Sequence, residues 1–149
     1  MNIALDTNVI VSGLLNPFSP CGKIVRMVSA GELRLCLDAR LLSEYSEVLA
    51  RPRFKFDAEL VSALLDHISH TGLLVAGSPL ALPLPDPDDA SFLEVALAGQ
   101  AEHLVTGNLK HFPPHLRGGM SVISPRDFID RYMQRGSKAS KPERQDETD

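Results

Sequence analysis

Short apolar runs alternate along this chain with longer segments in which apolar residues recur every three or four positions. The short runs read as buried strands, and they lie before Asp6 and over 33–37, 73–76, 103–105 and 121–123. The periodic segments are typical of amphipathic helices, which we expect over 20–30, 39–50, 58–71, 90–98 and from 125 onward, with a helical or coiled piece over 9–15. This alternation predicts an α/β domain whose parallel sheet is covered on both faces.

The bulk composition is that of one ordinary domain. The chain has 149 residues, 44% of them apolar, and a formal charge of −4. We expect the domain to cover 1–135 and a disordered polar tail to cover 136–149, because large apolar residues are missing from that end. A cytoplasmic protein is expected, since no apolar run is long enough to cross a bilayer and no signal peptide is visible. The acidic balance excludes a globally basic nucleic-acid binder but allows a local basic patch.

The first apolar run stops abruptly at Asp6-Thr7-Asn8. Ligands of open α/β sheets bind outside the carboxyl ends of the strands, so a carboxylate at this position is well placed for chemistry. The alternative is that Asp6 or Asn8 only caps the helix that follows. Position alone leaves both interpretations open.

Two glutamates on the predicted helix over 39–50 differ in orientation. On a helical wheel, Glu47 lies nearly opposite the apolar stripe, whereas Glu44 lies along its margin. Glu47 is therefore predicted to be a solvated surface charge. Glu44 is either a flanking residue with its carboxylate in water or a carboxylate directed at a site.

Three aspartates precede the predicted helix over 90–98. Asp86 is a good N-cap, and Asp88 and Asp89 suit the positive end of a helix dipole. Three acids nevertheless exceed what a cap requires, and their mutual repulsion is relieved when a cation lies between them. We therefore expect at least one of the three to be a metal ligand.

Thr106 and Asn108 follow the strand over 103–105, so hydroxyl and amide groups mark a second strand end. Asp6, Glu44, Asp89 and Asn108 occupy positions that can face one edge of a parallel sheet. Their oxygen donors suit Mg²⁺ or Mn²⁺, and imidazole or thiolate ligands are missing from these positions. Such a cation polarises a phosphoryl oxygen and lowers the pKa of a bound water.

Four short motifs stand at the ends of predicted elements. They are Leu5-Asp6-Thr7-Asn8-Val9, Glu44-Tyr45 followed by Val48-Leu49-Ala50-Arg51-Pro52, Asp86-Pro87-Asp88-Asp89 with Phe92-Leu93, and Leu104-Val105-Thr106-Gly107-Asn108. Each motif alone is weak, but the four in this order are fairly specific. On them the sequence resembles the PIN-domain nucleases, and within that family the VapC-like toxins of toxin–antitoxin pairs, over residues 2 to about 134.

The resemblance implies a three-layer α/β/α fold with a central parallel sheet of about five strands. It implies an endoribonuclease that uses Mg²⁺ or Mn²⁺ and a metal-activated water, with Asp6, Glu44 and Asp89 as the acidic core. Asp88 and Asp86 stay alternative ligands, because spacing does not decide which aspartate turns inward. The implied partners are an RNA substrate and a cognate antitoxin that covers the acidic pocket. A homodimer is common among similar proteins, and no membrane partner is expected.

The fourth motif departs from the family at Asn108, where many relatives have an aspartate. An amide oxygen can still act as a ligand but brings no charge, so a second metal is disfavoured and weaker activity is expected. The alternative function is therefore a catalytically weak PIN-like module that binds RNA or protein. Thr7, Asn8 and Thr106, with Asn108, are expected to hydrogen-bond the acids or a metal-bound water, although they are also ordinary turn residues.

RNA binding requires basic residues to contact phosphates, despite the acidic total. Two groups follow the candidate acids in the sequence, and their members are Arg51, Arg53 and Lys55, and Lys110, His111 and Arg117. The alternative is that these are scattered charges that keep the protein in solution.

Overall fold

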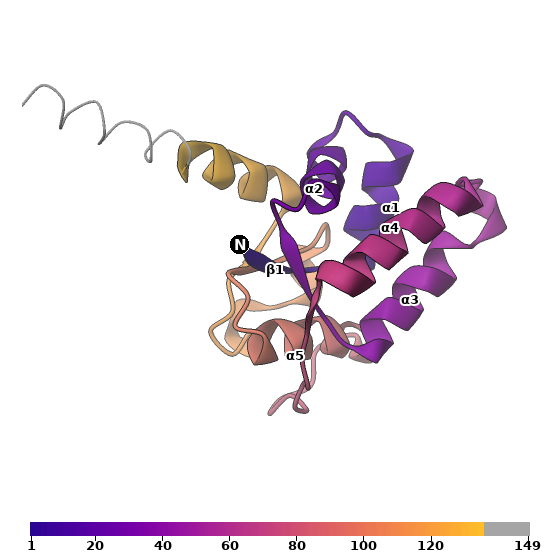
Figure 1. Ribbon diagram of the computed structural model, residues 1–149. Helices are drawn as coiled ribbons and strands as arrows, with labels where there is room; N and C mark the ends of the chain where they lie inside the picture. Colours follow the sequence, from indigo (N-terminus) through magenta and orange to yellow (C-terminus); the bar gives the residue numbers. More distant parts are fainter. Residues whose placement is uncertain (136–149) are drawn as a thin grey trace, which may run out of the picture.

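Five parallel strands form the centre of the computed structural model, which describes residues 1–135 (Figure 1). The strands are β1 (Asn2–Leu5), β2 (Arg34–Leu37), β3 (Leu73–Leu74), β4 (His103–Val105) and β5 (Val122–Ile123), in the order β3-β2-β1-β4-β5. β1 is the middle strand, so the residue that follows it lies at the centre of the carboxyl edge. The predicted parallel sheet is confirmed, and the tail predicted over 136–149 lies outside the described residues.

Helices cover both faces of this sheet, as expected from the sequence (Figure 1). One face carries α5 (Ala90–Ala98), which contacts β1, β2 and β4, while α4 (Ala58–Thr71) contacts β2. The other helices are α1 (Thr7–Leu15), α2 (Pro20–Ser29), α3 (Ala39–Leu49) and a last helix over 125–135. Within the described part of the chain, each helix is too short or too polar to cross a membrane.

The helices begin where the sequence places capping side chains. Ser19 accepts a hydrogen bond from the Gly22 amide at the start of α2, and Asp38 accepts one from the Leu41 amide at the start of α3. These bonds satisfy amides that the first turn of a helix leaves without a partner. The strand predicted over 73–76 is shorter than expected, because β3 ends at Leu74 and a proline-rich connection follows.

A buried tyrosine fixes α3 against the end of the central strand. Tyr45 is completely buried, and its hydroxyl donates a hydrogen bond of 2.5 Å to the backbone oxygen of Leu5. The neighbouring residue on α3 is Glu44, and the residue after Leu5 is Asp6. This single contact therefore holds two of the candidate acids near the same edge of the sheet.

The Tyr45 hydrogen bond yields a stability prediction. Tyr45→Phe should lower the free energy of unfolding by about 1–3 kcal/mol, because the buried Leu5 oxygen loses its donor. Urea unfolding measures the change. Tyr132→Phe is the matched control, since the Tyr132 hydroxyl lies 3.4 Å from a Glu32 oxygen at an exposed position. Equal losses in the two variants would contradict the role given to Tyr45.

Candidate active site

Asp6 makes hydrogen bonds that connect the end of β1 with the start of α1 and the end of β4. Its backbone amide donates to the Val105 oxygen at 3.0 Å. Its carboxylate accepts a bond of 3.3 Å from the Asn8 amide and one of 2.8 Å from the Thr106 hydroxyl. The side chain is almost fully buried, with 6% of Asp6 exposed. Asp6 therefore does cap α1, and the same carboxylate lies at the carboxyl edge of the sheet.

Glu44 is drawn toward the same edge by the residue next to Asp6. The Thr7 hydroxyl donates a hydrogen bond to the Glu44 carboxylate, which links α1 to α3. Thr7 is buried and Glu44 is half-buried. By contrast, Glu47 is exposed and pairs with Arg51 one turn further along at 2.9 Å, as expected for a surface charge. The two glutamates thus differ in the way that the helical wheel predicts.

The loop after β4 completes this network with a hydroxyl and backbone amides. The Thr106 hydroxyl, which donates to Asp6, also accepts a bond of 3.0 Å from the Asn108 amide. The Asn8 side-chain oxygen accepts a longer bond of 3.4 Å from the Gly107 amide. The Asn108 side chain itself is exposed. Asn108 therefore joins the network through its backbone.

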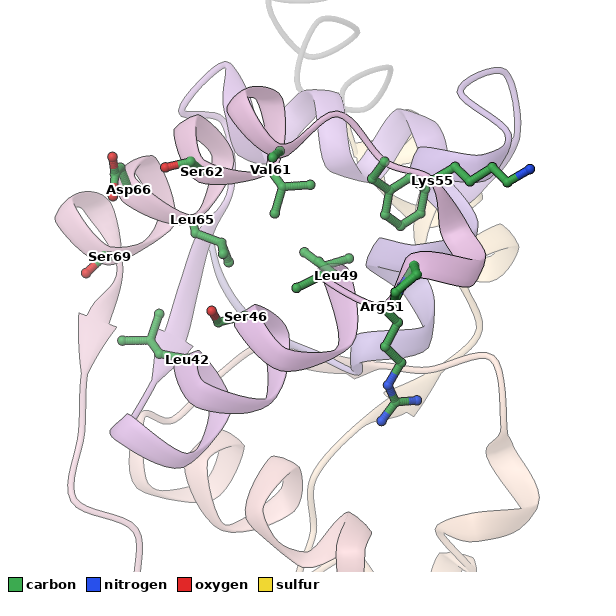
Figure 2. A pocket seen from close by; sticks show the side chains of 14 residues that line it. Leu42, Ser46, Leu49, Arg51, Lys55, Val61, Ser62, Leu65, Asp66 and Ser69 are labelled. Atoms are coloured by element: carbon green, nitrogen blue, oxygen red, sulfur yellow. The ribbon is translucent and has the colours of Figure 1, made fainter.

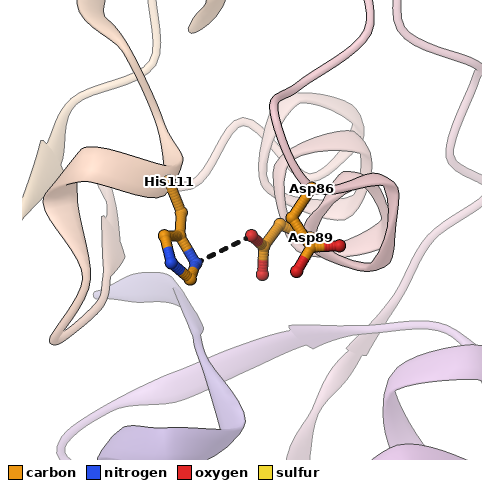
Figure 3. Close-up of side chains that lie close together, drawn as sticks. All are labelled: Asp86, Asp89 and His111. Atoms are coloured by element: carbon orange, nitrogen blue, oxygen red, sulfur yellow. Dashed lines mark ion pairs between the residues drawn. The ribbon is translucent and has the colours of Figure 1, made fainter.

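The three aspartates before α5 have different environments. Asp86 accepts a bond of 2.9 Å from the Asp88 amide and caps the short turn Pro87–Asp89, while Asp88 is exposed. Asp89 is buried and turns toward His111, whose Nδ1 lies 3.0 Å from its Oδ2 (Figure 3). Sequence spacing alone does not show which aspartate is buried, because this depends on how the turn Pro87–Asp89 leads into α5.

His111 stands in this acidic cluster, which the sequence did not indicate. Ligand atoms of Asp86, Asp89 and His111 all lie within 4.8 Å of one another. The sequence pattern places His111 with the basic residues and predicts oxygen ligands alone at the acidic site. The sequence signal for this placement is that His111 lies three residues after Asn108. The residues Leu109–His111 form a short turn, in which the His111 amide donates to the Asn108 oxygen at 3.0 Å, so the chain turns back at the end of β4.

The acids influence one another electrostatically. Burial raises the pKa of Asp6, and the bonds from Thr106 and Asn8 lower it in part. Burial also raises the pKa of Asp89, the charge of Asp6 raises it further, and His111 opposes the shift. The pKa of Tyr45 lies well above its usual value because of burial and the charges of Asp6 and Glu44. The charge of Asp6 therefore acts on both Asp89 and Tyr45, and the charge of Glu44 acts on Tyr45.

The donor set suits a divalent cation. Asp89 Oδ2 is buried, and among residues 1–135 it makes no hydrogen bond of standard geometry, although His111 Nδ1 lies 3.0 Å away, at ion-pair distance. A buried carboxylate oxygen without a partner is costly. A hard cation would satisfy that oxygen together with the neighbouring carboxylates.

The candidate RNA-binding residues differ in whether their side chains already contact other groups of the protein. Arg51 is paired with Glu47, and the Arg117 guanidinium donates to a backbone oxygen at 2.8 Å. Arg53 stacks over an aromatic ring at 4.8 Å from its centre. Lys110 is exposed and directly precedes His111. Lys110 is therefore an exposed basic residue next in sequence to a member of the acidic cluster.

A groove between α3 and α4 lies apart from the acids (Figure 2). It has a volume of about 570 Å³ and is lined by apolar residues such as Leu49, Val61 and Leu65, with Arg51 and Lys55 at one end. None of the candidate acids lines it. The groove is therefore a separate surface of the molecule.

Comparison with protein-family models matches residues 2–110 to the PIN domain. The matched segment extends from β1 to Lys110 and contains Asp6, Glu44, Asp89 and Asn108. Comparison with curated proteins and with solved structures gave no match.

The raised pKa of Asp89 yields a prediction about stability and pH. Because the ionised carboxyl is disfavoured in the folded state, Asp89→Asn should increase the free energy of unfolding near neutral pH in metal-free buffer. On acidification through the raised pKa toward the ordinary 3.8, the wild-type carboxyl becomes protonated and the advantage of asparagine disappears. Urea unfolding with a chelator over this range measures the difference.

Asp88→Asn is the matched control for this experiment, because Asp88 is the exposed neighbour of Asp89. Its free energy of unfolding should follow that of the wild type at every pH. If Asp89→Asn were less stable than the wild type throughout, Asp89 would act mainly as a structural residue.

Proposed function

The chain belongs to the PIN domain family, and on that premise we propose that it is a metal-dependent endoribonuclease that hydrolyses phosphodiester bonds of RNA with Mg²⁺ or Mn²⁺. The observation that supports the proposal is that Asp6 acts electrostatically on Asp89, while Thr7, the neighbour of Asp6, donates a hydrogen bond to Glu44. The buried oxygen of Asp89, which has no hydrogen-bond partner within the described chain, supports it.

Each acid would have a distinct part in holding the cation. Asp89 would offer its buried oxygen, and Asp86, the other carboxylate of the cluster, would support it. Asp6 would be held in place by Thr106 and Asn8, and Glu44 by Thr7, so that these polar neighbours orient the carboxylates. When bound, the cation would neutralise phosphate charge and activate water for attack on phosphorus. Asp88 is exposed and is the least suited of the three aspartates.

The RNA backbone would approach along the exposed side of the acidic cluster. Lys110, the exposed neighbour of His111 in the sequence, would contact a phosphate, which would partly offset the repulsion between RNA and the carboxylates. Arg53 and Lys55 are exposed at the far end of α3 and would bind a more distant part of the strand. Arg51 and Arg117 would first have to leave their partners in the protein.

We further propose that this nuclease is the toxin of a toxin–antitoxin pair and acts in the cytoplasm, where its RNA substrate lies. The four motifs support this assignment, and so does the charge of the site. A cluster of carboxylates attracts a basic side chain, so an antitoxin that inserted one would compete with the cation. That two copies of the chain associate stays a prediction.

A second candidate function is a weak RNA- or protein-binding module. The observation in its favour is Asn108, whose exposed side chain brings no charge to the site. Such a module would bind RNA without cutting it.

Cleavage assays separate the two functions. Wild-type protein should cleave RNA with Mn²⁺ and lose the activity with a chelator. Asp6→Asn, Glu44→Gln and Asp89→Asn should each lower the rate by roughly 100-fold or more, because loss of even an outer-shell partner costs about 10–100-fold. Gel electrophoresis of labelled RNA measures the rates. Glu47→Gln is the matched control for Glu44→Gln and should cleave like the wild type.

Equal cleavage by wild-type protein and Asp6→Asn would overturn the nuclease proposal, because the activity would then come from a contaminant. RNA binding without cleavage by the wild type would favour the binding module.

The toxin role is tested by growth. Induced expression of the wild-type chain in a bacterial host should arrest growth, whereas Asp89→Asn, expressed to the same level, should not, because the arrest requires RNA cleavage. Optical density and the integrity of total RNA measure the effect. Growth arrest by both proteins would contradict a toxin that acts through the acidic site.

A further inference from the structure

We propose that His111 is a direct nitrogen ligand of the cation held by Asp86 and Asp89, and that it makes the site prefer Mn²⁺ to Mg²⁺. This inference rests on the proposed function only in assuming that a divalent cation binds at these carboxylates. It assigns to His111 a role other than that of a phosphate contact.

The first support is geometric. His111 Nδ1 lies 3.0 Å from Asp89 Oδ2, and ligand atoms of both residues lie within 4.8 Å of one from Asp86 (Figure 3). Two neighbouring ligands at right angles around a cation, each about 2.1 Å from it, stand roughly 3 Å apart. The 3.0 Å separation, which is also that of an ion pair, therefore fits a pair of ligands.

The second support is the missing hydrogen bond. Despite the short distance, Asp89 Oδ2 has no hydrogen-bond partner among the described residues. A neutral ring nitrogen and a carboxylate oxygen this close repel one another unless a proton or a cation lies between them. A divalent cation bound by both atoms would remove that repulsion and would also satisfy the buried oxygen.

The third support is that the protein holds the ring in place. His111 is followed by Phe112, which is completely buried in the core. The His111 amide donates to the Asn108 oxygen at 3.0 Å, and the Arg117 guanidinium donates to the Phe112 oxygen at 2.8 Å. The turn Leu109–His111 is thus fixed on both sides, so the imidazole would require little reorganisation to become a ligand.

The preference for Mn²⁺ follows from the ligand type. Mg²⁺ binds oxygen ligands almost exclusively and keeps several waters, whereas imidazole binds transition metals well. Replacing one oxygen of a carboxylate site by a nitrogen therefore favours Mn²⁺ relative to Mg²⁺. The carboxylates of Asp86 and Asp89 keep the site hard enough for both ions.

Spectroscopy on the full wild-type chain tests the ligand directly. Bound Mn²⁺ should show a nitrogen hyperfine coupling in electron spin echo envelope modulation, because an imidazole nitrogen would be coordinated. The coupling should vanish in His111→Gln and persist in His115→Gln. His115 is a matched control, since it is exposed on the next turn of the same loop and lies outside the cluster.

Calorimetric titration with each ion tests the preference. His111→Gln should weaken Mn²⁺ binding by about tenfold or more, whereas Mg²⁺ binding should change clearly less, because that ion gains little from the imidazole. His115→Gln should bind both ions like the wild type. Thermal unfolding without metal should show that both variants are folded.

The outcomes separate this inference from the nuclease proposal. Wild-type protein that cleaves RNA with Mn²⁺, but whose bound Mn²⁺ lacks nitrogen coupling, would overturn the role of His111 and leave the nuclease standing. Nitrogen coupling that depends on His111, in a protein that does not cleave RNA, would support the ligand and overturn the nuclease. A wild-type chain that binds neither ion would overturn the ligand proposal.

Discussion

The carboxylate of Asp6 is the point on which the arrangement of this molecule depends. It caps α1, receives the hydroxyl of Thr106 from the end of β4, and follows the strand end that Tyr45 holds against α3. A buried negative charge is tolerated there because hydrogen bonds offset part of its desolvation. The same residue therefore helps to set the geometry of the sheet edge and contributes a carboxylate that would attract the proposed cation.

The proposed cation would reduce two kinds of electrostatic repulsion. In the folded chain the charge of Asp6 acts on Asp89, and the proposed RNA substrate is itself an anion. A divalent ion between them would reduce the repulsion within the protein and the repulsion between protein and RNA. The net charge of −4 is thus compatible with an RNA-directed activity, because the attraction would be local.

Much of the scaffold could be predicted from the sequence, and less of the site. The alternation of apolar runs predicts the parallel sheet, and the helical phase of α3 distinguishes Glu44 from Glu47 correctly. The burial of Asp89 rather than Asp88 depends on a short turn that runs directly into α5, and helical periodicity does not describe such a turn. The place of His111 depends likewise on a turn after β4, whose direction is set by contacts with the core.

The buried ring of Phe112 has a consequence for how this scaffold could be modified. Because Phe112 is completely buried and the His111 side chain is about half exposed, the core contact of Phe112 holds this turn in place. The side chain at that position could be exchanged for a carboxylate, an amide or a thiol while the backbone keeps its course. A substitution at this one position would then change the proposed metal ligand, and so the metal selectivity of the site, while the rest of the domain keeps its structure.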